Sequence, residues 1–347
     1  MAGLSGENRL GLPTAHRYVV FLVDGLGWEL LRGAADHAPY LSQLAERGRA
    51  ITSGVPSTTS TSITSLGTGL APGQHGIAGY TFRYDQHLLN ALTWEEGLSG
   101  LDVQPQLTYF ERLVKAGIRA SSVTPARFRR SGLTMSALRG PDFLDVQDES
   151  DSDRRIALTV QGATSAERTA VYLYERKLDH TGHAHGCASR QWHTELSNID
   201  SFTARLRDAL PDDVRLLITG DHGMVDIDPT AQILIEDEPG LNSGIALIGG
   251  EPRLRQLYVQ RGQTGAVAAR WRDRLGDDAW VTTREEATEA GWFGPMSPRL
   301  ADRFGDVLVA CRGPIALMSR TQPNELNLIG MHGSLTPAEM NVPLLVG

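Results

Sequence analysis

Apolar residues along the chain occur in two kinds of segment, and the two kinds alternate. The short continuous runs YVVFLV (18–23), AVYLY (170–174) and LLIT (216–219) are typical of strands buried on both faces of a parallel sheet. Residues 39–48 and 193–210 instead repeat apolar positions every three or four residues, which predicts helices. This alternation predicts an α/β fold, a doubly wound and mostly parallel sheet sandwiched by helices.

Two segments do not follow this alternation. Residues 83–155 contain few clean strand–helix pairs and end in the charged stretch DVQDESDSDRR. Residues 231–313 begin with short runs such as AQILIE and GIALIGG, which predict a smaller sheet placed before the last strand. We therefore interpret residues 1–347 as a single domain with two insertions, a cap-like one at 83–155 and a smaller β-rich one at 231–313.

Residues 54–69, GVPSTTSTSITSLGTG, are rich in hydroxyl groups. Composition alone favours a polar linker, but Ile63 and Leu66 are three residues apart, on one face of a short helix. Residues 57–60 are all good helix N-caps, and Gly67 or Gly69 can end the helix. We predict a strand, a turn and a helix with a hydroxyl at its start, where free N–H groups favour anions.

Composition and charge narrow the class of protein. The 347 residues are 41% hydrophobic and 21% charged, which is typical of a soluble globular protein with a large core. The net charge is −8 and no block of Lys or Arg stands out, so nucleic acid is not an expected partner.

Cys187 and Cys311 form no disulfide framework and no Cys-x-x-Cys motif. The first seventeen residues lack the apolar core of a signal peptide, and the run at 18–23 is too short to span a bilayer. We expect a cytoplasmic protein without a membrane partner.

Asp and His residues follow the predicted strands and recur near the C-terminus. In an open α/β sheet, functional groups gather beyond the carboxyl ends of the strands, so these residues can converge in one pocket. Carboxylates and imidazoles are ligands for zinc, manganese or iron. Any one Asp/His pair is more often structural, but the clusters together with the hydroxyl-rich helix start predict a metal centre. The clusters are Asp24, Asp179 to His183, Asp221-His222 and His332.

Other nucleotide-binding and hydrolase motifs do not fit. A dinucleotide-binding interpretation of DGLGWEL (24–30) fails because Leu30 stands where the third glycine belongs. The sequence contains no Walker A motif and no Gly-x-Ser-x-Gly elbow.

The order and spacing of the remaining motifs resemble the alkaline phosphatase superfamily, most closely its type I phosphodiesterase/nucleotide pyrophosphatase branch. In that branch an Asp-Gly ends a strand, a Pro-[Ser/Thr]-x-Thr segment carries the nucleophile, and Asp-x-x-x-His, Asp-His-Gly and a late His-Gly follow. The resemblance extends from Asp24 to the end of the chain. The matching residues are Pro56 to Thr59, Thr68 to Pro72, His75-Gly76-Ile77, Asp179, His183 to Gly186, Asp221-His222-Gly223 and His332-Gly333.

The resemblance implies an alkaline-phosphatase-like fold and a two-metal hydrolase of phosphate esters. One divalent metal ion would be held by Asp179, His183 and His332, and the other by Asp24, Asp221, His222 and the oxygen of Thr59. Zinc is the expected metal, with manganese or iron as alternatives. Thr59 would be the nucleophile, activated by a cation and passing through a phospho-threonine intermediate. The whole chain would then be one catalytic domain, with 83–155 facing the substrate.

One position departs from the branch. Many of its diesterases place an Asn after the His-Gly-Ile stretch to bind a phosphate oxygen, and here Tyr80 occupies that position. A phenol can donate one hydrogen bond, so Tyr80 either binds the substrate or only packs in the insertion. Arg83 is a further candidate for binding an anion, although a lone Arg is more often solvated. His75, His180 and His185 are interpreted as neighbours of the site rather than as ligands.

The reaction class stays open at this point. We expect a small phosphorylated substrate and a phosphodiesterase or nucleotide pyrophosphatase. A phosphomonoesterase or a phosphonate hydrolase of the same superfamily is the alternative. A sulfatase is disfavoured because the Cys-x-Pro-x-Arg signature is missing. A metal-binding protein without catalysis is the alternative from another class, and the sequence does not predict the oligomeric state.

Overall fold

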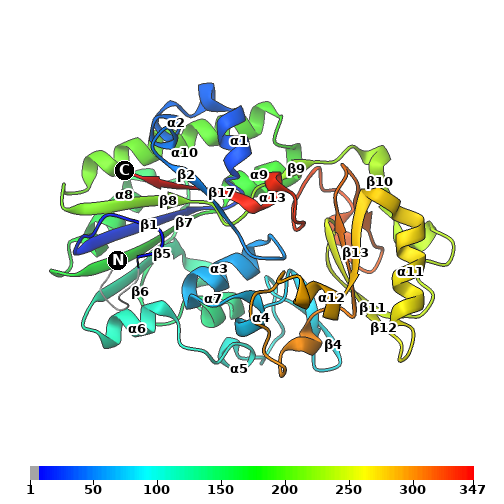
Figure 1. The fold of residues 1–347 in the computed structure, drawn as a ribbon. Coiled ribbons are helices and arrows are strands. Elements are labelled where there is room, and N and C mark those ends of the chain that lie inside the picture. Colours follow the sequence, from blue (N-terminus) through cyan, green and yellow to red (C-terminus); the bar gives the residue numbers. More distant parts are fainter. Residues whose placement is uncertain (1–7) are drawn as a thin grey trace.

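Seven strands form the main sheet of the computed structural model, which describes residues 8–347, in the order β2-β17-β8-β1-β7-β5-β6 (Figure 1). Strands β8, β1, β7, β5 and β6 run parallel, and β17 runs antiparallel to both of its neighbours. The fold is the mostly parallel α/β sheet that we predicted. The strands are β1 (Arg17–Val23), β2 (Arg49–Thr52), β5 (Arg119–Pro125), β6 (Asp142–Val146), β7 (Thr169–Glu175), β8 (Val214–Thr219) and β17 (Asn341–Val346).

Helices cover both faces of this sheet (Figure 1). Side chains of β1 alternate between the two faces, so Phe21 packs on one side and Leu22 on the other, and both are fully buried. This two-sided burial explains the uninterrupted apolar runs in the sequence. On the Phe21 face lie α1 (Trp28–Gly33), α2 (Pro39–Ala45), α8 (Ser152–Ala163), α9 (Lys177–His185) and α10 (Arg190–Ala209), and on the other face lie α3 (Thr59–Thr68), α6 (Tyr109–Lys115) and α7 (Gly132–Ala137).

The smaller sheet expected within 231–313 is present. It is antiparallel, in the order β11-β12-β14-β13, and α11 (Thr264–Leu275) packs on it around the buried Trp271. Three two-stranded ladders, β3–β4, β10–β15 and β9–β16, are separate from both sheets. The strands are β11 (Ile245–Glu251), β12 (Leu254–Val259), β13 (Ala279–Thr283), β14 (Val307–Cys311), β3 (Thr81–Tyr84), β4 (His87–Asn90), β10 (Gln232–Leu234), β15 (Ala316–Met318), β9 (Val225–Asp226) and β16 (Gly330–Met331). The remaining helices are α4 (Pro72–His75), α5 (Gly100–Val103), α12 (Arg284–Glu289) and α13 (Pro337–Met340).

The structure corrects the interpretation of 83–155 as a cap-like insertion. Strands β5 and β6 lie in this range and form one edge of the main sheet, and α8 begins at Ser152. The pattern was missed because β5, RASSVTP, buries Ser121, Ser122 and Thr124 in place of aliphatic residues. The first part of the range, with most of the β3–β4 hairpin and α5, precedes these strands and forms no part of the main sheet. The interpretation as one domain stays a prediction.

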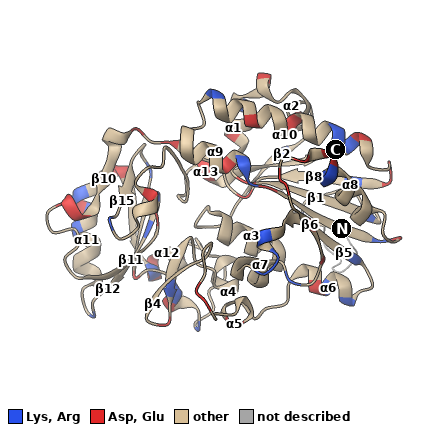
Figure 2. Ribbon diagram, turned by 180° about the vertical axis from the view of Figure 1, so that it is seen from behind, with Lys and Arg blue, Asp and Glu red and all other residues tan. Residues whose placement is uncertain are grey.

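Charged residues of both signs are interspersed over the ribbon (Figure 2). Within residues 8–347, no helix combines the length and apolar character needed to cross a bilayer. The prediction that no signal peptide is present depends partly on residues 1–7, which lie outside the described residues.

Candidate active site

The strands at the centre of the sheet end side by side and bring the predicted residues together. Val23 pairs with Glu175, and Leu22 pairs with Thr219, so β1, β7 and β8 stop at the same level. Asp24 and Asp221 follow directly, and Asp179 follows in the first turn of α9. Gly25 has a φ of 74°, and a Cβ there would lie 3.0 Å from the Cα of Asp179. The Asp-Gly pair is thus required for this close approach.

Thr59 is the first residue of α3, and its hydroxyl points into the cluster. Its Oγ1 lies 3.3 Å from Oδ1 of Asp24 and 3.2 Å from Nε2 of His222. Two neighbouring hydroxyls donate to backbone carbonyls instead. Ser57 donates to the carbonyl of Ser334, and Ser60 donates to that of Gly79. Thr59 is therefore the hydroxyl of this segment that geometry offers for chemistry.

Two groups of side chains have the composition of metal sites. In each, one ligand atom per residue lies within 4.8 Å of the others, and the groups are Asp24, Asp221, His222 and Asp179, His222, His332. His183 completes the cluster, because its Nε2 lies 3.4 Å from Oδ2 of Asp179 one helical turn away. The structure thus brings together all seven residues predicted as ligands. One detail differs from the predicted grouping, because His222 lies within reach of both groups and not only of Asp24 and Asp221. Its ring stacks on that of His332, with the centroids 3.6 Å apart.

Backbone carbonyls fix the orientation of the three imidazoles. In each ring Nδ1 lies within hydrogen-bond distance of a carbonyl oxygen: His183 with Gly330 at 2.7 Å, His222 with Gly223 at 2.9 Å, and His332 with Ser57 at 2.9 Å. A carbonyl oxygen only accepts, so Nδ1 carries the proton and donates in all three rings. Nε2 of each ring then faces the carboxylates, which is the usual arrangement of metal-binding histidines. Burial opposes protonation of His222, but Asp221 and Asp24 raise its pKa to about 10, so a bound cation would replace a proton at its Nε2.

The carboxylates also fit a cation. Oδ1 of Asp179 and Oδ2 of Asp221 are buried and have no hydrogen-bond partner. Burial and repulsion from Asp24 raise the pKa of Asp179 and of Asp221 well above the ordinary value. Burial also opposes ionisation of Asp24, but the neighbouring His222 and the hydroxyl of Tyr174 hold its pKa below the ordinary value. Three crowded acids, two of them with an orphaned oxygen, form a site that divalent cations would stabilise.

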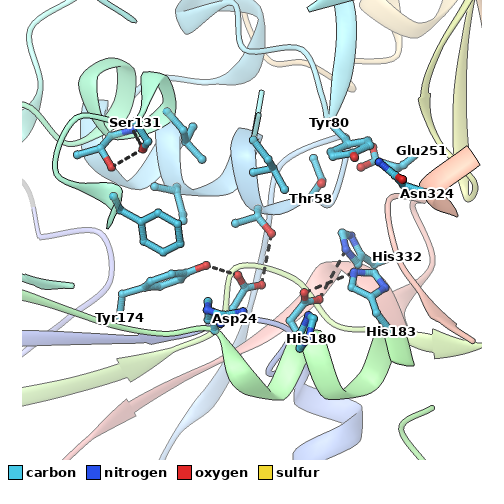
Figure 3. Close-up of a pocket in the computed structure, with 18 of the residues that line it drawn as sticks. Asp24, Thr58, Tyr80, Ser131, Tyr174, His180, His183, Glu251, Asn324 and His332 are labelled. Carbon is cyan, nitrogen blue, oxygen red and sulfur yellow. Dashed lines mark hydrogen bonds and ion pairs between the residues drawn. The ribbon is translucent and has the colours of Figure 1, made fainter. Parts of the chain in front are cut away.

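A cavity of about 390 Å³ opens above these residues (Figure 3). Tyr80, Glu251 and Asn324 lie on one side of Asp24 and Thr58, and Ser131 and Tyr174 lie on the other. Tyr80 therefore lines the candidate substrate cavity, and burial raises the pKa of its phenol. Arg83 lies elsewhere, where it donates to the carbonyl of Asp302.

Sequence reasoning missed several residues of the cavity. Tyr174 donates a short hydrogen bond to Oδ2 of Asp24, and its place on β7 next to a strand end could have suggested it. Glu251, Asn324 and Glu325 come from segments with no recognisable motif. Of the histidines set aside, His180 lines the cavity.

His75 serves the structure. Its Nδ1 accepts a hydrogen bond from the backbone N–H of Ile77, and its Nε2 lies 3.0 Å from Oγ of Ser65. Burial and the charge of Arg303 lower its pKa to about 3, so the ring is neutral. It therefore holds the loop after α4 in place, as its interpretation as a neighbour of the site predicted.

A family model described as type I phosphodiesterase / nucleotide pyrophosphatase matches residues 18–335. The chain belongs to this family. Its members are hydrolases of phosphoric esters that depend on metal ions, within the alkaline phosphatase superfamily.

A curated relative and several solved structures agree with this placement. Ectonucleotide pyrophosphatase/phosphodiesterase family member 7 of Rattus norvegicus is 24% identical over 238 residues, 64% of this chain and 53% of that protein, so the chain spans about half the length of this relative. Murine ectonucleotide pyrophosphatase/phosphodiesterase 5, an inactive variant in complex with AMP, matches with a TM-score of 0.72 and 17% identity over 95% of this chain and 87% of its own. Phosphonoacetate hydrolase from Sinorhizobium meliloti 1021, in complex with phosphonoformate, matches with a TM-score of 0.74 and 19% identity. That match covers 96% of this chain and 90% of the hydrolase chain. At these identities the structures show the shared fold.

Proposed function

We propose that the protein is a metal-dependent phosphodiesterase with two divalent cations and with Thr59 as its nucleophile. The observation that carries the proposal is the position of Oγ1 of Thr59, between Asp24 and His222 at the edge of the cavity. When bound, the cations would supply positive charge beside this oxygen and beside the phosphoryl group. Zinc is the metal that we propose first, because the donors are imidazoles and carboxylates.

The residues of the chain have separate tasks in the proposed reaction. The Thr59 hydroxyl donates to Asp24, so its lone pairs remain free to attack phosphorus. The new bond from Thr59 to phosphorus replaces the bond to the leaving alcohol, which takes up the proton that the Thr59 hydroxyl loses. Water then releases the phosphate monoester from Thr59 and restores the hydroxyl. The first N–H groups of α3 have no acceptors within the helix, so phosphoryl oxygens can accept from them. Tyr80 lines the cavity and, in this proposal, donates to a phosphoryl oxygen in place of the usual amide.

The test compares Thr59→Ala with Thr59→Ser, on bis-p-nitrophenyl phosphate beside p-nitrophenyl phosphate. Both variants should fold, because Thr59 is half-buried and fills no core position. Both should retain metal, because the six carboxylate and imidazole ligands remain in place. We expect Thr59→Ala to lose at least about 10³-fold in kcat, while Thr59→Ser keeps measurable turnover. Wild-type turnover in Thr59→Ala would remove Thr59 from the mechanism.

The same assay separates the alternatives. Faster cleavage of the monoester would indicate a phosphatase. Release of phosphate from phosphonoacetate would favour a phosphonate hydrolase, the activity named for one structural neighbour. Stoichiometric metal without turnover of any of these substrates would favour a non-catalytic metal-binding protein.

A further inference from the structure

The cavity has two chemically different walls. The polar wall consists of Tyr80, Glu251, Asn324 and Glu325. The apolar wall consists of Ile63, Leu92, Phe128, Leu133 and Leu138. Figure 3 shows Tyr80, Glu251 and Asn324 on one side of Thr58, and Ser131, which immediately precedes α7, on the other. A substrate held by its phosphoryl group at Thr59 would extend between these walls.

The apolar wall is built from packed elements. Leu138 and Ile63 are nearly fully buried, and Leu133 packs against them in the core beneath α3 and α7. A Cβ on Gly132 would lie 2.0 Å from the ring of Trp94, so the loop that carries Leu92 lies directly against the start of α7. Leu92 itself is 49% exposed at the cavity. This wall offers dispersion contacts and desolvation to an organic group, and its aliphatic side chains offer no hydrogen bonds.

Cationic side chains for a polyanion are lacking. Among the residues that line the cavity, Arg176 is the one Lys or Arg, and its Nε already donates to Glu149 at 2.9 Å. Glu251 and Glu325 are buried carboxyls on the opposite wall, each with an oxygen that has no hydrogen-bond partner. A second or third phosphate group would therefore meet carboxyls and aliphatic carbon.

The charge of the metal centre fits a singly charged ester. Two divalent cations exceed the three carboxylates of Asp24, Asp179 and Asp221 by one positive charge. A phosphodiester carries one negative charge, whereas a nucleoside triphosphate carries several that this cavity cannot balance.

We infer that the cavity selects phosphodiesters whose organic groups are uncharged and apolar or aromatic, and that it excludes polyphosphates. This inference rests on the proposed function and narrows its substrate class. Leu92, Phe128 and Leu133 determine the specificity, because they face the cavity from elements outside the metal centre.

The first test compares kcat/KM for three substrates at matched free metal: bis-p-nitrophenyl phosphate, the p-nitrophenyl ester of thymidine 5′-monophosphate, and ATP. The first two carry one negative charge and release the same p-nitrophenolate. We expect both to exceed ATP at least tenfold. Equal or faster cleavage of ATP would overturn the inference.

The second test moves charge into the cavity with a matched control. Leu92→Arg places a cation at the apolar wall, and Val114→Arg makes a similar change on α6, away from the cavity, at 48% exposure. We expect Leu92→Arg to reduce the preference for the aryl diester over ATP at least threefold, whereas Val114→Arg leaves it unchanged. An unchanged preference in Leu92→Arg, or an equal change in both variants, would contradict the role of the wall.

A binding measurement separates this inference from the proposed function. Calorimetry on metal-loaded Thr59→Ala needs no turnover. Bis-p-nitrophenyl phosphate should bind at least tenfold more tightly than ATP. If no substrate is cleaved but this order of affinities holds, the proposed reaction fails and the cavity's selectivity stands. If ATP binds as tightly, or the diester does not bind, the selectivity fails whatever the enzyme cleaves.

Discussion

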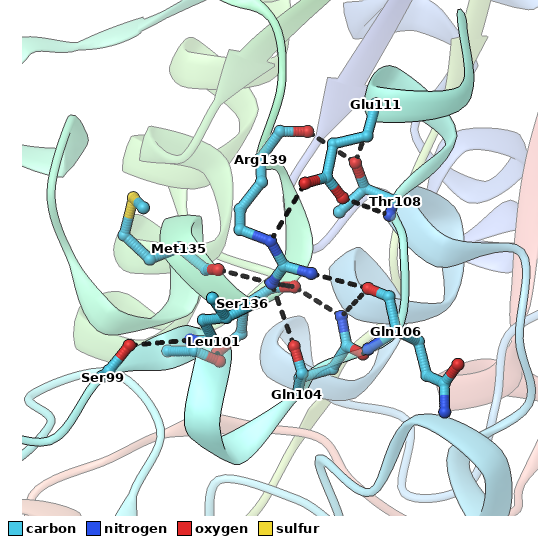
Figure 4. Close-up of polar contacts among 10 residues, drawn as sticks. Ser99, Leu101, Gln104, Gln106, Thr108, Glu111, Met135, Ser136 and Arg139 are labelled. Atoms are coloured by element: carbon cyan, nitrogen blue, oxygen red, sulfur yellow. Dashed lines mark hydrogen bonds and ion pairs between the residues drawn. The ribbon is translucent and has the colours of Figure 1, made fainter. Parts of the chain in front are cut away.

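Arg139 connects the segments behind the apolar wall, and its replacement by Met tests how that wall is held. Its guanidinium is almost fully buried and donates to four carbonyl oxygens (Figure 4). The acceptors are Gln104 at 3.0 Å, Met135 at 2.7 Å, Ser136 at 3.0 Å and Gln106 at 2.6 Å. Arg139→Met keeps the aliphatic stem and removes all four hydrogen bonds.

The expected cost follows from which carbonyls are left without a donor. The side-chain amide of Gln104 also donates to the carbonyls of Ser136 and Gln106, so these two keep a partner. The carbonyls of Gln104 and Met135 have no other donor among the described residues. Each carbonyl left without a donor costs about 1–3 kcal/mol, so the two together should lower the free energy of unfolding of Arg139→Met by roughly 2–6 kcal/mol.

Urea unfolding followed by tryptophan fluorescence measures this loss, with an unchanged m-value as the sign that the reference state is the same. Arg205→Met is the matched control, because Arg205 pairs with Asp153 at the surface and should cost less than about 1 kcal/mol. Since α7 carries Leu133, we also expect Arg139→Met to raise KM for the aryl diester more than it lowers kcat. A loss below about 1 kcal/mol would refute the carbonyl argument.

Two further predictions concern the ionisable groups. Chelation should lower the Tm, and zinc or manganese should restore it, more at pH 8 than at pH 6 because protons compete with metal for the ligands; a Tm that does not respond to metal would contradict a metal site. Burial raises the pKa of Glu251 to about 8. Between the ordinary pKa of a Glu and this raised value, the folded state keeps a proton that the unfolded chain has already released. The free energy of unfolding should therefore fall as the pH rises through that range. In urea titrations, the free energy of unfolding of the wild type should fall between pH 6 and pH 9 by roughly 2–3 kcal/mol more than that of Glu251→Gln. If the two proteins instead show the same pH dependence, Glu251 does not titrate in this range.

The central strands and the ligands could be predicted from sequence because they obey local rules. Strands β1, β7 and β8 are buried on both faces, so they appear as uninterrupted apolar runs, and their ends mark Asp24 and Asp221 without knowledge of the fold. Asp179 and His183 are four residues apart on one helix, a spacing that sequence displays directly. A short helix in the hydroxyl-rich segment was predicted from its capping residues, and of the two glycines proposed for its end, the structure uses Gly69, where φ is 69°.

The cavity walls could not be predicted in this way, because their residues depend on distant partners. Strand β12 buries Arg255 completely, which a hydropathy pattern does not anticipate. Its guanidinium pairs with Glu325, seventy residues further along the chain, and that pair fixes one of the carboxyls of the polar wall. Similarly, β5 and β6 were missed because buried hydroxyls and an exposed edge replace the aliphatic pattern.

The histidine anchors show why motif residues alone do not make the metal site. The three Nδ1 groups donate to carbonyls of Gly330, Gly223 and Ser57, which belong to separate segments of the chain. Two of these carbonyls come from strand β16 and from the turn before α3, so the imidazoles are oriented only when those segments are in place. A chain could carry every ligand at the right spacing and still direct Nε2 away from the carboxylates. Here the backbone carbonyls occupy Nδ1, so Nε2 is the nitrogen that faces the cluster, where the orphaned oxygens of Asp179 and Asp221 also lie.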